Sequence, residues 1–328
     1  MAMTADGTLR FLHDTFDPAA GERFRVDAIG AAATPVSSVR VDQAGLAGAW
    51  YAPYEDGQGF TFDYIASAHV VFMPWFTYGF NGGADPAQLA WYALQGTSEP
   101  GARSVELDIY MTDPGTFNVG VVDTHKVGSA HLSFTDCNSG LLIYQFVQGV
   151  NNAAGGTISL TRISPSTSSC ELADSTMVSA QNSNMAAQGF DARQSGSWFE
   201  PSTSGQGLQL TIIPAGNNYA GLVFAAWFTF DPANLADDPG HQHWFTLQGD
   251  LTTATNGQVT LPIYRTLGGT FDFAATLDTV QVGHATLSMQ GCDKARIDYQ
   301  FDLSEVAHAF TGLSGSTDLV KIGGCSMP

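Results

Sequence analysis

The sequence predicts an all-β protein that consists of two tandem eight-stranded antiparallel modules. Three observations predict this fold class: the composition, a repeat that spans the chain, and the alternation of apolar residues. Glycine contributes 36 of the 328 residues, aromatic residues make up 11% and charged residues only 13%. An average protein has about 25% charged residues. A composition of this kind favours strands and turns over helices.

The repeat consists of pairs of short motifs. Residues 48–53, Gly-Ala-Trp-Tyr-Ala-Pro, return at 196–201 as Gly-Ser-Trp-Phe-Glu-Pro. Further pairs follow in the same order: Gly57–Gly59 with Gly205–Gly207, Trp75–Tyr78 with Trp227–Phe230, Trp91–Gly96 with Trp244–Gly249, and Gly115–Phe117 with Gly269–Phe271. The offset grows from 148 residues at the first pair to 155 at the cysteines, as expected when insertions fall in loops. We therefore divide the chain into a lead-in (1–46), a first β-module (47–170), a linker (171–195) and a second β-module (196–328).

The four cysteines follow the same register. Cys137 and Cys170 recur as Cys292 and Cys325, so each copy holds two cysteines 33 residues apart. Neither pair has the spacing of a zinc site. We predict one disulfide within each copy, 137–170 and 292–325, each stabilising the fold by about 3.7 kcal/mol in the chain-entropy model. Disulfides indicate an oxidising compartment, so we expect a secreted or periplasmic protein.

Alternating apolar residues predict the strands. Val105, Leu107 and Ile109 point one way, while Glu106 and Asp108 point the other. A period of two residues is typical of half-buried antiparallel strands. Runs of this kind in the first copy predict eight strands, near 48–52, 57–65, 68–78, 90–96, 104–111, 127–135, 140–147 and 156–163. Eight sequential strands suit an up-and-down β-barrel, which removes exposed edges, with a β-sandwich as the alternative.

The opening of each copy favours the barrel. Gly48-x-Trp50 and Gly196-x-Trp198 resemble the Gly-x-Trp signature on the first strand of lipocalins and avidins, the calycin-like barrels. In those families a basic residue on the last strand packs across the tryptophan, and Arg162 and Lys321 occupy the equivalent places here. The resemblance implies a cation–π contact at one end of each barrel. The longer pattern also resembles uncharacterised repeats in secreted proteins of Gram-negative bacteria.

The charge balance excludes several classes of partner. Twelve basic against 31 acidic residues give a net charge of −19, which repels phosphate backbones and anionic lipid. We therefore expect no nucleic-acid partner. No run approaches the ~18 consecutive apolar residues of a membrane helix, so we expect no membrane insertion. The start, residues 1–3, resembles the remnant of a cloning vector and is left out of the fold prediction.

The residues that both copies share are aromatic and amide rather than ionisable. Such side chains form pockets for neutral ligands, including sugars. The alternative is that the rings fill the core and the amides satisfy backbone groups. The candidate ligand-binding residues are Trp91, Gln95, Trp244, Gln248, Gln58, Gln206, Tyr110 and Tyr264. Each tryptophan of the pairs at 91/95 and 244/248 stands four residues before its glutamine, which places both side chains on one face of a strand.

A second group of candidates occurs in the second copy alone. His241 and His243 lie two residues apart, so a strand would place both imidazoles on one face, which makes them candidate metal ligands. Asp231 and Asp237 precede them in an oxygen-rich loop and are candidate calcium ligands, although the spacing fits no EF-hand. Surface histidines are the alternative. No other cofactor is expected.

These observations lead to three hypotheses on function. The first is a secreted, non-catalytic binding protein with one site per module for a carbohydrate or small apolar molecule. The second is an enzyme whose catalytic or metal site is private to one module, for example around His243. The third is a structural or inhibitory surface protein that acts through its loops. A hollow, Trp-lined barrel would favour the first, a metal near His243 the second, and filled barrels the third.

Overall fold

The structure is a computed structural model in which two units are distinguished, residues 1–36 and 37–328. In the first unit, Ala2–Met3 (β1) pairs antiparallel with Leu9–Arg10 (β2). The second unit contains both repeat copies. The described residues are 2–3, 9–10 and 39–324, except for 54–56, 80–88, 113–114, 121, 164–165, 167, 180–188, 204, 214, 216–220, 233–241 and 272–275.

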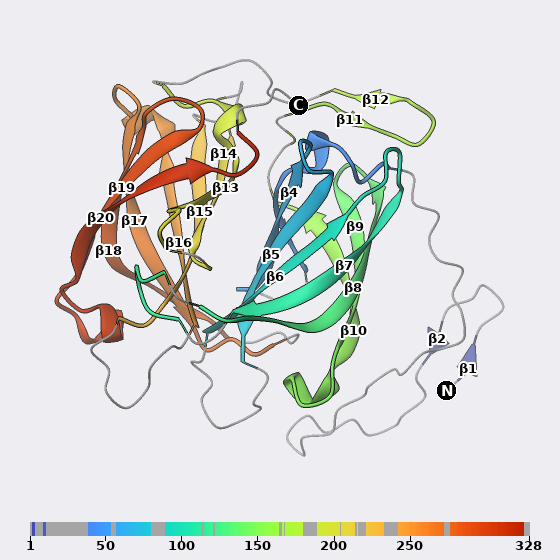
Figure 1. Cartoon of the computed structure of the whole chain (residues 1–328), viewed down its shortest axis with the longest axis horizontal. Helices are drawn as coiled ribbons and strands as arrows, with labels where there is room; N and C mark the ends of the chain where they lie inside the picture. Colours follow the sequence, from blue (N-terminus) through green and yellow to red (C-terminus); the bar gives the residue numbers. More distant parts are fainter. Residues whose placement is uncertain are drawn as a thin grey trace. The chain divides into compact units, whose positions relative to one another are not determined.

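The first copy forms a closed barrel of eight antiparallel strands (Figure 1). Each strand pairs with its neighbour in sequence, and the last closes on the first, so the up-and-down topology is confirmed. The strands are Gly48–Tyr51 (β3), Gly59–Ile65 (β4), Val70–Tyr78 (β5), Leu89–Thr97 (β6), Ser104–Thr112 (β7), Thr124–Asp136 (β8), Ser139–Phe146 (β9) and Gly155–Arg162 (β10). These bounds agree with the eight predicted ranges to within three residues, because the alternation is strong in every strand.

The second copy forms a second closed barrel with the same strand order. Its strands are Gly196–Phe199 (β13), Gly207–Ile213 (β14), Leu222–Phe230 (β15), Gln242–Asp250 (β16), Gln258–Leu267 (β17), Asp278–Met289 (β18), Lys294–Phe301 (β19) and Ser314–Lys321 (β20). The remaining elements are a short hairpin and short 3₁₀ helices. They are Cys170–Glu171 (β11), Met177–Val178 (β12), Ala44–Leu46 (η2), Asn151–Ala153 (η3), Ala192–Gln194 (η4), Leu251–Thr253 (η5) and Glu305–Phe310 (η6). Among the described residues, we find no helix with the length and hydropathy of a membrane span.

The Gly-x-Trp strands close both barrels as expected. Trp50 lies opposite Arg162 in the register of β3 and β10, and the guanidinium carbon stands 4.6 Å from the centre of the indole ring. Trp198 likewise lies opposite Lys321. Lys321, however, donates to the carbonyl of Gly324. Within the described part of the chain, the cation–π contact is recorded in the first barrel alone.

One of the two predicted disulfides is fully described. Cys137 and Cys170 are bonded, with their Cα atoms 6.1 Å apart, so the disulfide within the first copy is confirmed. Cys292 is also disulfide-bonded. The partner predicted for it, Cys325, lies outside the described residues.

Side chains fill both barrels, and one ring in each comes from the other copy. Phe271, which follows β17, packs inside the first barrel with its ring 5.0 Å from that of Trp75. Phe117, which follows β7, packs inside the second barrel, 5.8 Å from Trp227. Figure 1 shows the green segment after β7 reaching across to the orange barrel. The Gly-Thr-Phe motif of each copy is therefore a plug for the other copy's barrel.

Candidate functional site

The two barrels pack together through the outer faces of equivalent strands. The apolar residues of this interface form a buried cluster of their own, made up of Phe76, Tyr78, Leu89, Trp91, Ala226, Phe228, Phe230 and Trp244. They project outward because the intervening residues of each strand, such as Tyr92 and Phe245, fill the barrel interiors. The outer faces of these strands thus form the interface between the two barrels of one chain.

Trp91 and Trp244 lie at this interface as a reciprocal pair. The indole N–H of Trp244 donates to the carbonyl of Thr77 at 2.8 Å, and that of Trp91 points to the carbonyl of Thr229 at 3.4 Å. Gln242 strengthens one side, since it accepts from the Trp91 backbone N–H and donates to the carbonyl of Thr112 at the end of β7, both in the first barrel. Both rings are buried, and both hold the two copies together.

Gln58 and Gln206 hold the plug loops in place. The amide of Gln206 donates to the carbonyls of Thr116 and Val119 at 3.0 and 3.1 Å. Its oxygen accepts from the backbone N–H of Asn118 at 3.0 Å. Gln58 donates in the same way to the carbonyl of Thr270 at 2.9 Å. The Gly-Gln-Gly motif therefore recognises the backbone of the other copy's Gly-Thr-Phe motif.

The remaining predicted ligand-binding residues lie beside the tryptophans. Gln95 and Gln248 are exposed on the outer faces of β6 and β16. Tyr110 stands opposite Ala93 in the register of β6 and β7, and Tyr264 stands opposite Thr246. The structure therefore brings each Trp, Gln and Tyr set to one outer barrel face, whereas Gln58 and Gln206 bind the plug loops.

The candidate metal residues are described only in part. His243 and Asp231 form a buried pair, with Nε2 2.7 Å from Oδ1, whereas His241 and Asp237 lie outside the described residues. Burial lowers the pKa of His243, and the hydrogen bond to Asp231 opposes that shift. Within the described ranges, no group of three His, Cys, Asp or Glu side chains could hold a metal ion. The first copy has Ala90 at the place of His243.

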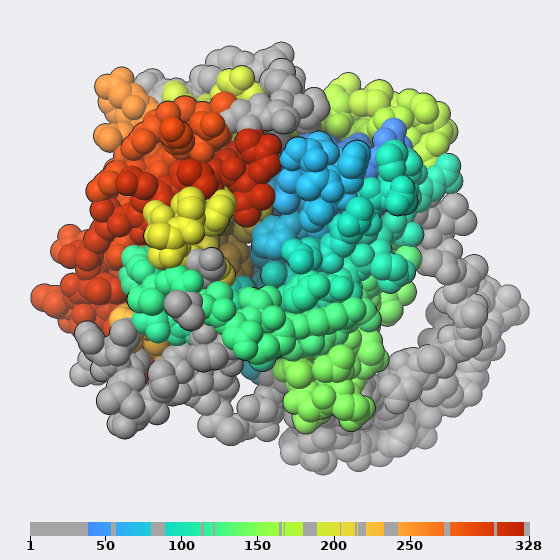
Figure 2. Space-filling model, viewed as in Figure 1, coloured from blue at the N-terminus to red at the C-terminus, as the bar shows by residue number. Residues whose placement is uncertain are grey.

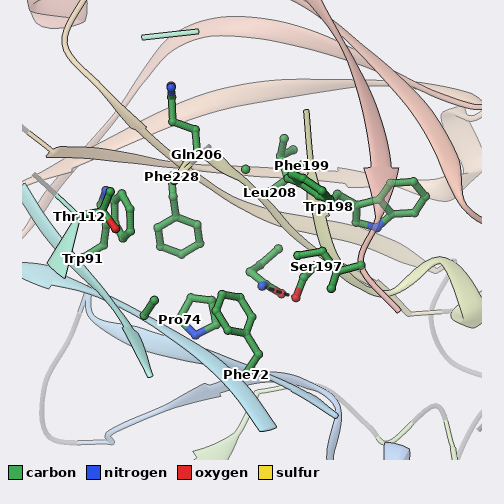
Figure 3. A pocket seen from close by; sticks show the side chains of 15 residues that line it. Phe72, Pro74, Trp91, Thr112, Ser197, Trp198, Phe199, Gln206, Leu208 and Phe228 are labelled. Atoms are coloured by element: carbon green, nitrogen blue, oxygen red, sulfur yellow. Dashed lines mark hydrogen bonds between the residues drawn. The ribbon is translucent and has the colours of Figure 1, made fainter. Parts of the chain in front are cut away.

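A groove opens between the barrels on one side of the interface, and we call it the first groove. It has a volume of about 240 Å³. Phe72, Pro74 and Trp91 line it from the first barrel, while Phe199 and Phe228 line it from the second (Figure 3). The space-filling view shows the boundary between the blue and green first barrel and the yellow and red second barrel hollowed near its centre (Figure 2). Its walls combine five aromatic side chains with aliphatic residues and the polar side chains of Thr112, Ser197, Gln206 and Gln209.

An equivalent groove lies on the other side of the interface, and we call it the second groove. It has a volume of about 400 Å³ and is lined by repeat counterparts of many first-groove residues, and by Arg162, whose counterpart Lys321 does not line the first groove. Trp244 replaces Trp91, Tyr51 replaces Phe199, and Phe224 replaces Phe72. The duplication therefore produces two related grooves, each with walls from both copies.

The first groove differs from the second in a chain of polar side chains. Oδ2 of Asp63, on β4, accepts from the backbone N–H and the hydroxyl of Ser197 at 3.0 and 2.9 Å. The Ser197 hydroxyl oxygen accepts from Nε2 of Gln209 at 2.7 Å. Burial raises the pKa of Asp63, while the hydrogen bond from Ser197 and the charge of Lys321 oppose that shift. By repeat register the counterparts of these three residues are Thr211, Ala49 and Thr61, and none of them lines the second groove.

The raised pKa of Asp63 makes stability depend on pH. A carboxyl whose pKa is higher in the folded state stabilises the fold below its ordinary value of 3.8, and this contribution is lost as the pH rises through the raised pKa. Asp63→Asn keeps an acceptor for Ser197 but cannot ionise. Relative to this variant, we expect the wild type to lose stability as the pH rises from about 4, by up to ~1.4 kcal/mol per unit of pKa shift. Urea unfolding of both proteins at pH 4, 5, 6 and 7 measures the difference, and a difference that does not change with pH would contradict it.

Asp63, Ser197 and Gln209 were not among the residues predicted to bind a ligand. One signal was available, because Asp63 is the only charged residue of Gly59–Ile65, where the second copy has Thr211. A carboxylate on an otherwise apolar strand needs partners. Its partner Ser197 is 134 residues away, and no local pattern indicates that distance.

The fold and these grooves define a class of protein: a tandem pair of closed eight-stranded β-barrels, interlocked by reciprocal plugs, with two related grooves between them. The chain matches no family model, and the comparison with curated proteins finds no match.

Proposed function

We propose that the protein is a non-catalytic binding protein whose uncharged ligands occupy the two grooves between its barrels. The observation that carries the proposal is the pair of equivalent grooves, each with aromatic walls contributed by both copies. Apolar concave sites with a few placed polar groups are typical of small-molecule binding. The ligand classes are those expected from the sequence, a small apolar molecule or a carbohydrate.

The packing of the barrels supports a site outside them. Rings of Trp75, Tyr144 and Phe146 surround Phe271 inside the first barrel, with centroids 5.0 to 6.0 Å away. A core of this density leaves no room for a ligand of comparable size. In calycin-like barrels the interior is the expected place for a ligand. Because Phe271 and Phe117 occupy the interiors here, we place the ligands outside the barrels.

The disulfide supports a secreted or periplasmic location. The bond between Cys137 and Cys170 persists in an oxidising compartment, whereas cytosolic thiols are kept reduced. An acidic chain with a net charge of −19 would stay dispersed in such a compartment.

A second candidate function has an observation in its favour. Filled barrels favour a structural or inhibitory protein that acts through its outer surface and loops. The large exposed apolar side chains on that surface include Leu303, which is 90% exposed and precedes η6. The grooves favour the binding function, because they are concave and recur in both copies.

The proposal is tested by calorimetric titration of the whole chain with three uncharged probes: 2-naphthol, 2-methoxynaphthalene and maltotriose. We expect saturable binding of at least one probe. The double variant Ala93→Phe plus Thr246→Phe places a ring in each groove, since Ala93 and Thr246 occupy equivalent lining positions. It should abolish that binding.

The matched control is Ser159→Phe, which adds a ring at an exposed position of β10 away from the grooves. It should bind as the wild type does. No binding of any probe, or binding that survives the double variant, would overturn the proposed function.

A further inference from the structure

We propose that the first groove is selective for an uncharged aromatic molecule that carries a hydroxyl or N–H group, and that this group donates to Oε1 of Gln209. The inference rests on the proposed function and names the ligand class of one of the two grooves. Three observations on the described residues carry it: the direction of the polar chain, the aromatic walls, and the contrast with the second groove.

The direction of the polar chain is fixed at its buried end. Oδ2 of Asp63 receives two hydrogen bonds from Ser197, so it acts as an acceptor and the Ser197 hydroxyl must donate to it. With its only hydrogen used, the hydroxyl oxygen can only accept from Gln209. Nε2 of Gln209 is therefore the atom that meets Ser197, at 2.7 Å.

This direction decides what Gln209 offers to a ligand. Because Nε2 faces Ser197, the other end of the amide is the carbonyl oxygen Oε1, an acceptor with two lone pairs. Gln209 lines the first groove, and its Oε1 is not among the fully buried polar atoms that lack a partner. Within the described residues, no protein donor to this oxygen is recorded. A ligand that donates to Oε1 would extend the series of hydrogen bonds that runs from Asp63 through Ser197 to Gln209.

The walls of the first groove select the body of the ligand. Phe72 and Pro74 face Phe199 and Phe228 across the space, and Trp91 lies beside Phe228 with ring centres 5.7 Å apart. Aromatic walls bind flat apolar rings by stacking and edge contacts. A volume of about 240 Å³ exceeds the 150 Å³ of an engineered cavity that holds benzene, so one or two fused rings are of suitable size.

The second groove has no counterpart of Gln209 on its wall, and Arg162, which can only donate, lines it instead. Thr61 stands at the place of Gln209, and Ala49 at the place of Ser197, so the polar chain cannot form there. The counterpart of Asp63 is Thr211, which carries no charge. The two grooves have similar aromatic walls but different hydrogen-bonding groups, and selectivity for a donor belongs to the first alone.

The test compares two probes that differ in one hydrogen-bond donor. 2-Naphthol carries a hydroxyl, and 2-methoxynaphthalene is its methyl ether. At pH 6 we expect the wild type to bind 2-naphthol at least about tenfold more tightly, which is the effect of one hydrogen bond of ~1.4 kcal/mol. Gln209→Leu should weaken 2-naphthol binding by about tenfold and leave the ether unchanged.

Matched variants separate the two grooves. Thr61 is the repeat counterpart of Gln209 and lines neither groove, so Thr61→Val should leave both affinities unchanged. Ala93→Phe should remove the selective site, whereas Thr246→Phe should keep it. If Gln209→Leu does not fold, Gln209→Thr carries the same test, because the first copy tolerates Thr61 at that place.

Two results would overturn this inference and leave the proposed function standing. One is equal affinity of the wild type for both probes, and the other is a preference that persists in the folded Gln209 variant. Binding of maltotriose, without binding of either naphthalene probe, would also overturn this inference and leave the proposed function standing. Failure of all three probes to bind would overturn the proposed function itself, so the two failures are distinguishable.

Discussion

Replacing Phe271 with alanine is expected to lower the free energy of unfolding by about 3–5 kcal/mol, the usual cost of deleting a buried aromatic ring. Phe271 is 1% exposed and packs against Trp75, Tyr144 and Phe146 inside the first barrel. The lost contacts belong to the first barrel although the residue belongs to the second copy. Urea unfolding followed by tryptophan fluorescence measures the loss.

The reciprocal variant Phe117→Ala should have an effect of similar size. Its ring lies 5.4 to 5.8 Å from those of Trp227, Tyr299 and Phe310 in the second barrel. Val119→Ala is the matched control, because Val119 lies in the same loop but is 47% exposed. It should change stability by less than about 0.5 kcal/mol.

The plugs also bear on cooperativity. Since each barrel's core contains a ring from the other copy, we expect the wild type to unfold in one transition. A loss below about 1 kcal/mol for either phenylalanine variant would mean that the barrels do not depend on their plugs.

Replacing Trp50 with alanine is expected to lower the free energy of unfolding by about 3–5 kcal/mol for the lost ring. Loss of the cation–π contact should add roughly 0.5–2 kcal/mol. The ring is fully buried and donates its N–H to the carbonyl of Leu46 at 3.0 Å. Arg162 stacks on it while its guanidinium donates to three backbone carbonyls, those of Cys137, Ala47 and Gly45. Burial lowers the pKa of Arg162 to about 10, so the group remains charged at neutral pH.

The second copy supplies the comparison. Trp198 has an equivalent hydrogen bond, to the carbonyl of Gln194 at 2.9 Å, but Lys321 opposite it donates elsewhere. Trp198→Ala should therefore cost less than Trp50→Ala, by about the cation–π term. Urea unfolding of the two variants measures the difference between their losses of stability. Equal losses would show that the arginine adds nothing to its tryptophan.

Much of each barrel could be predicted from the sequence. The alternation in segments such as Val105, Leu107 and Ile109 predicts both the strand and the buried face, because a strand exposes every second side chain to one side. The Gly-x-Trp openings and the basic residue at 162 predicted which strands meet at closure. These features are local or recur in register, so a single sequence displays them.

The candidate site could be predicted only in part. Trp91, Gln95 and Tyr110 do share one face, as do Trp244, Gln248 and Tyr264. Which face they share was not predictable, because burial of Trp91 results from the other barrel. Alternation alone cannot distinguish a barrel interior from an interface between barrels.

The sequence by itself determined the duplication, the eight strands of each copy, the barrel topology and the disulfide at 137–170. Each follows from short-range periodicity or from a register that the two copies share. Only the tertiary structure decided that Gly-Thr-Phe plugs the other barrel, that Gln58 and Gln206 bind those plugs, and that Asp63 meets Ser197. These contacts join residues 88 to 212 positions apart. Their energies depend on how two closed surfaces fit together, and that fit is set by packing in three dimensions rather than by any pattern along the chain.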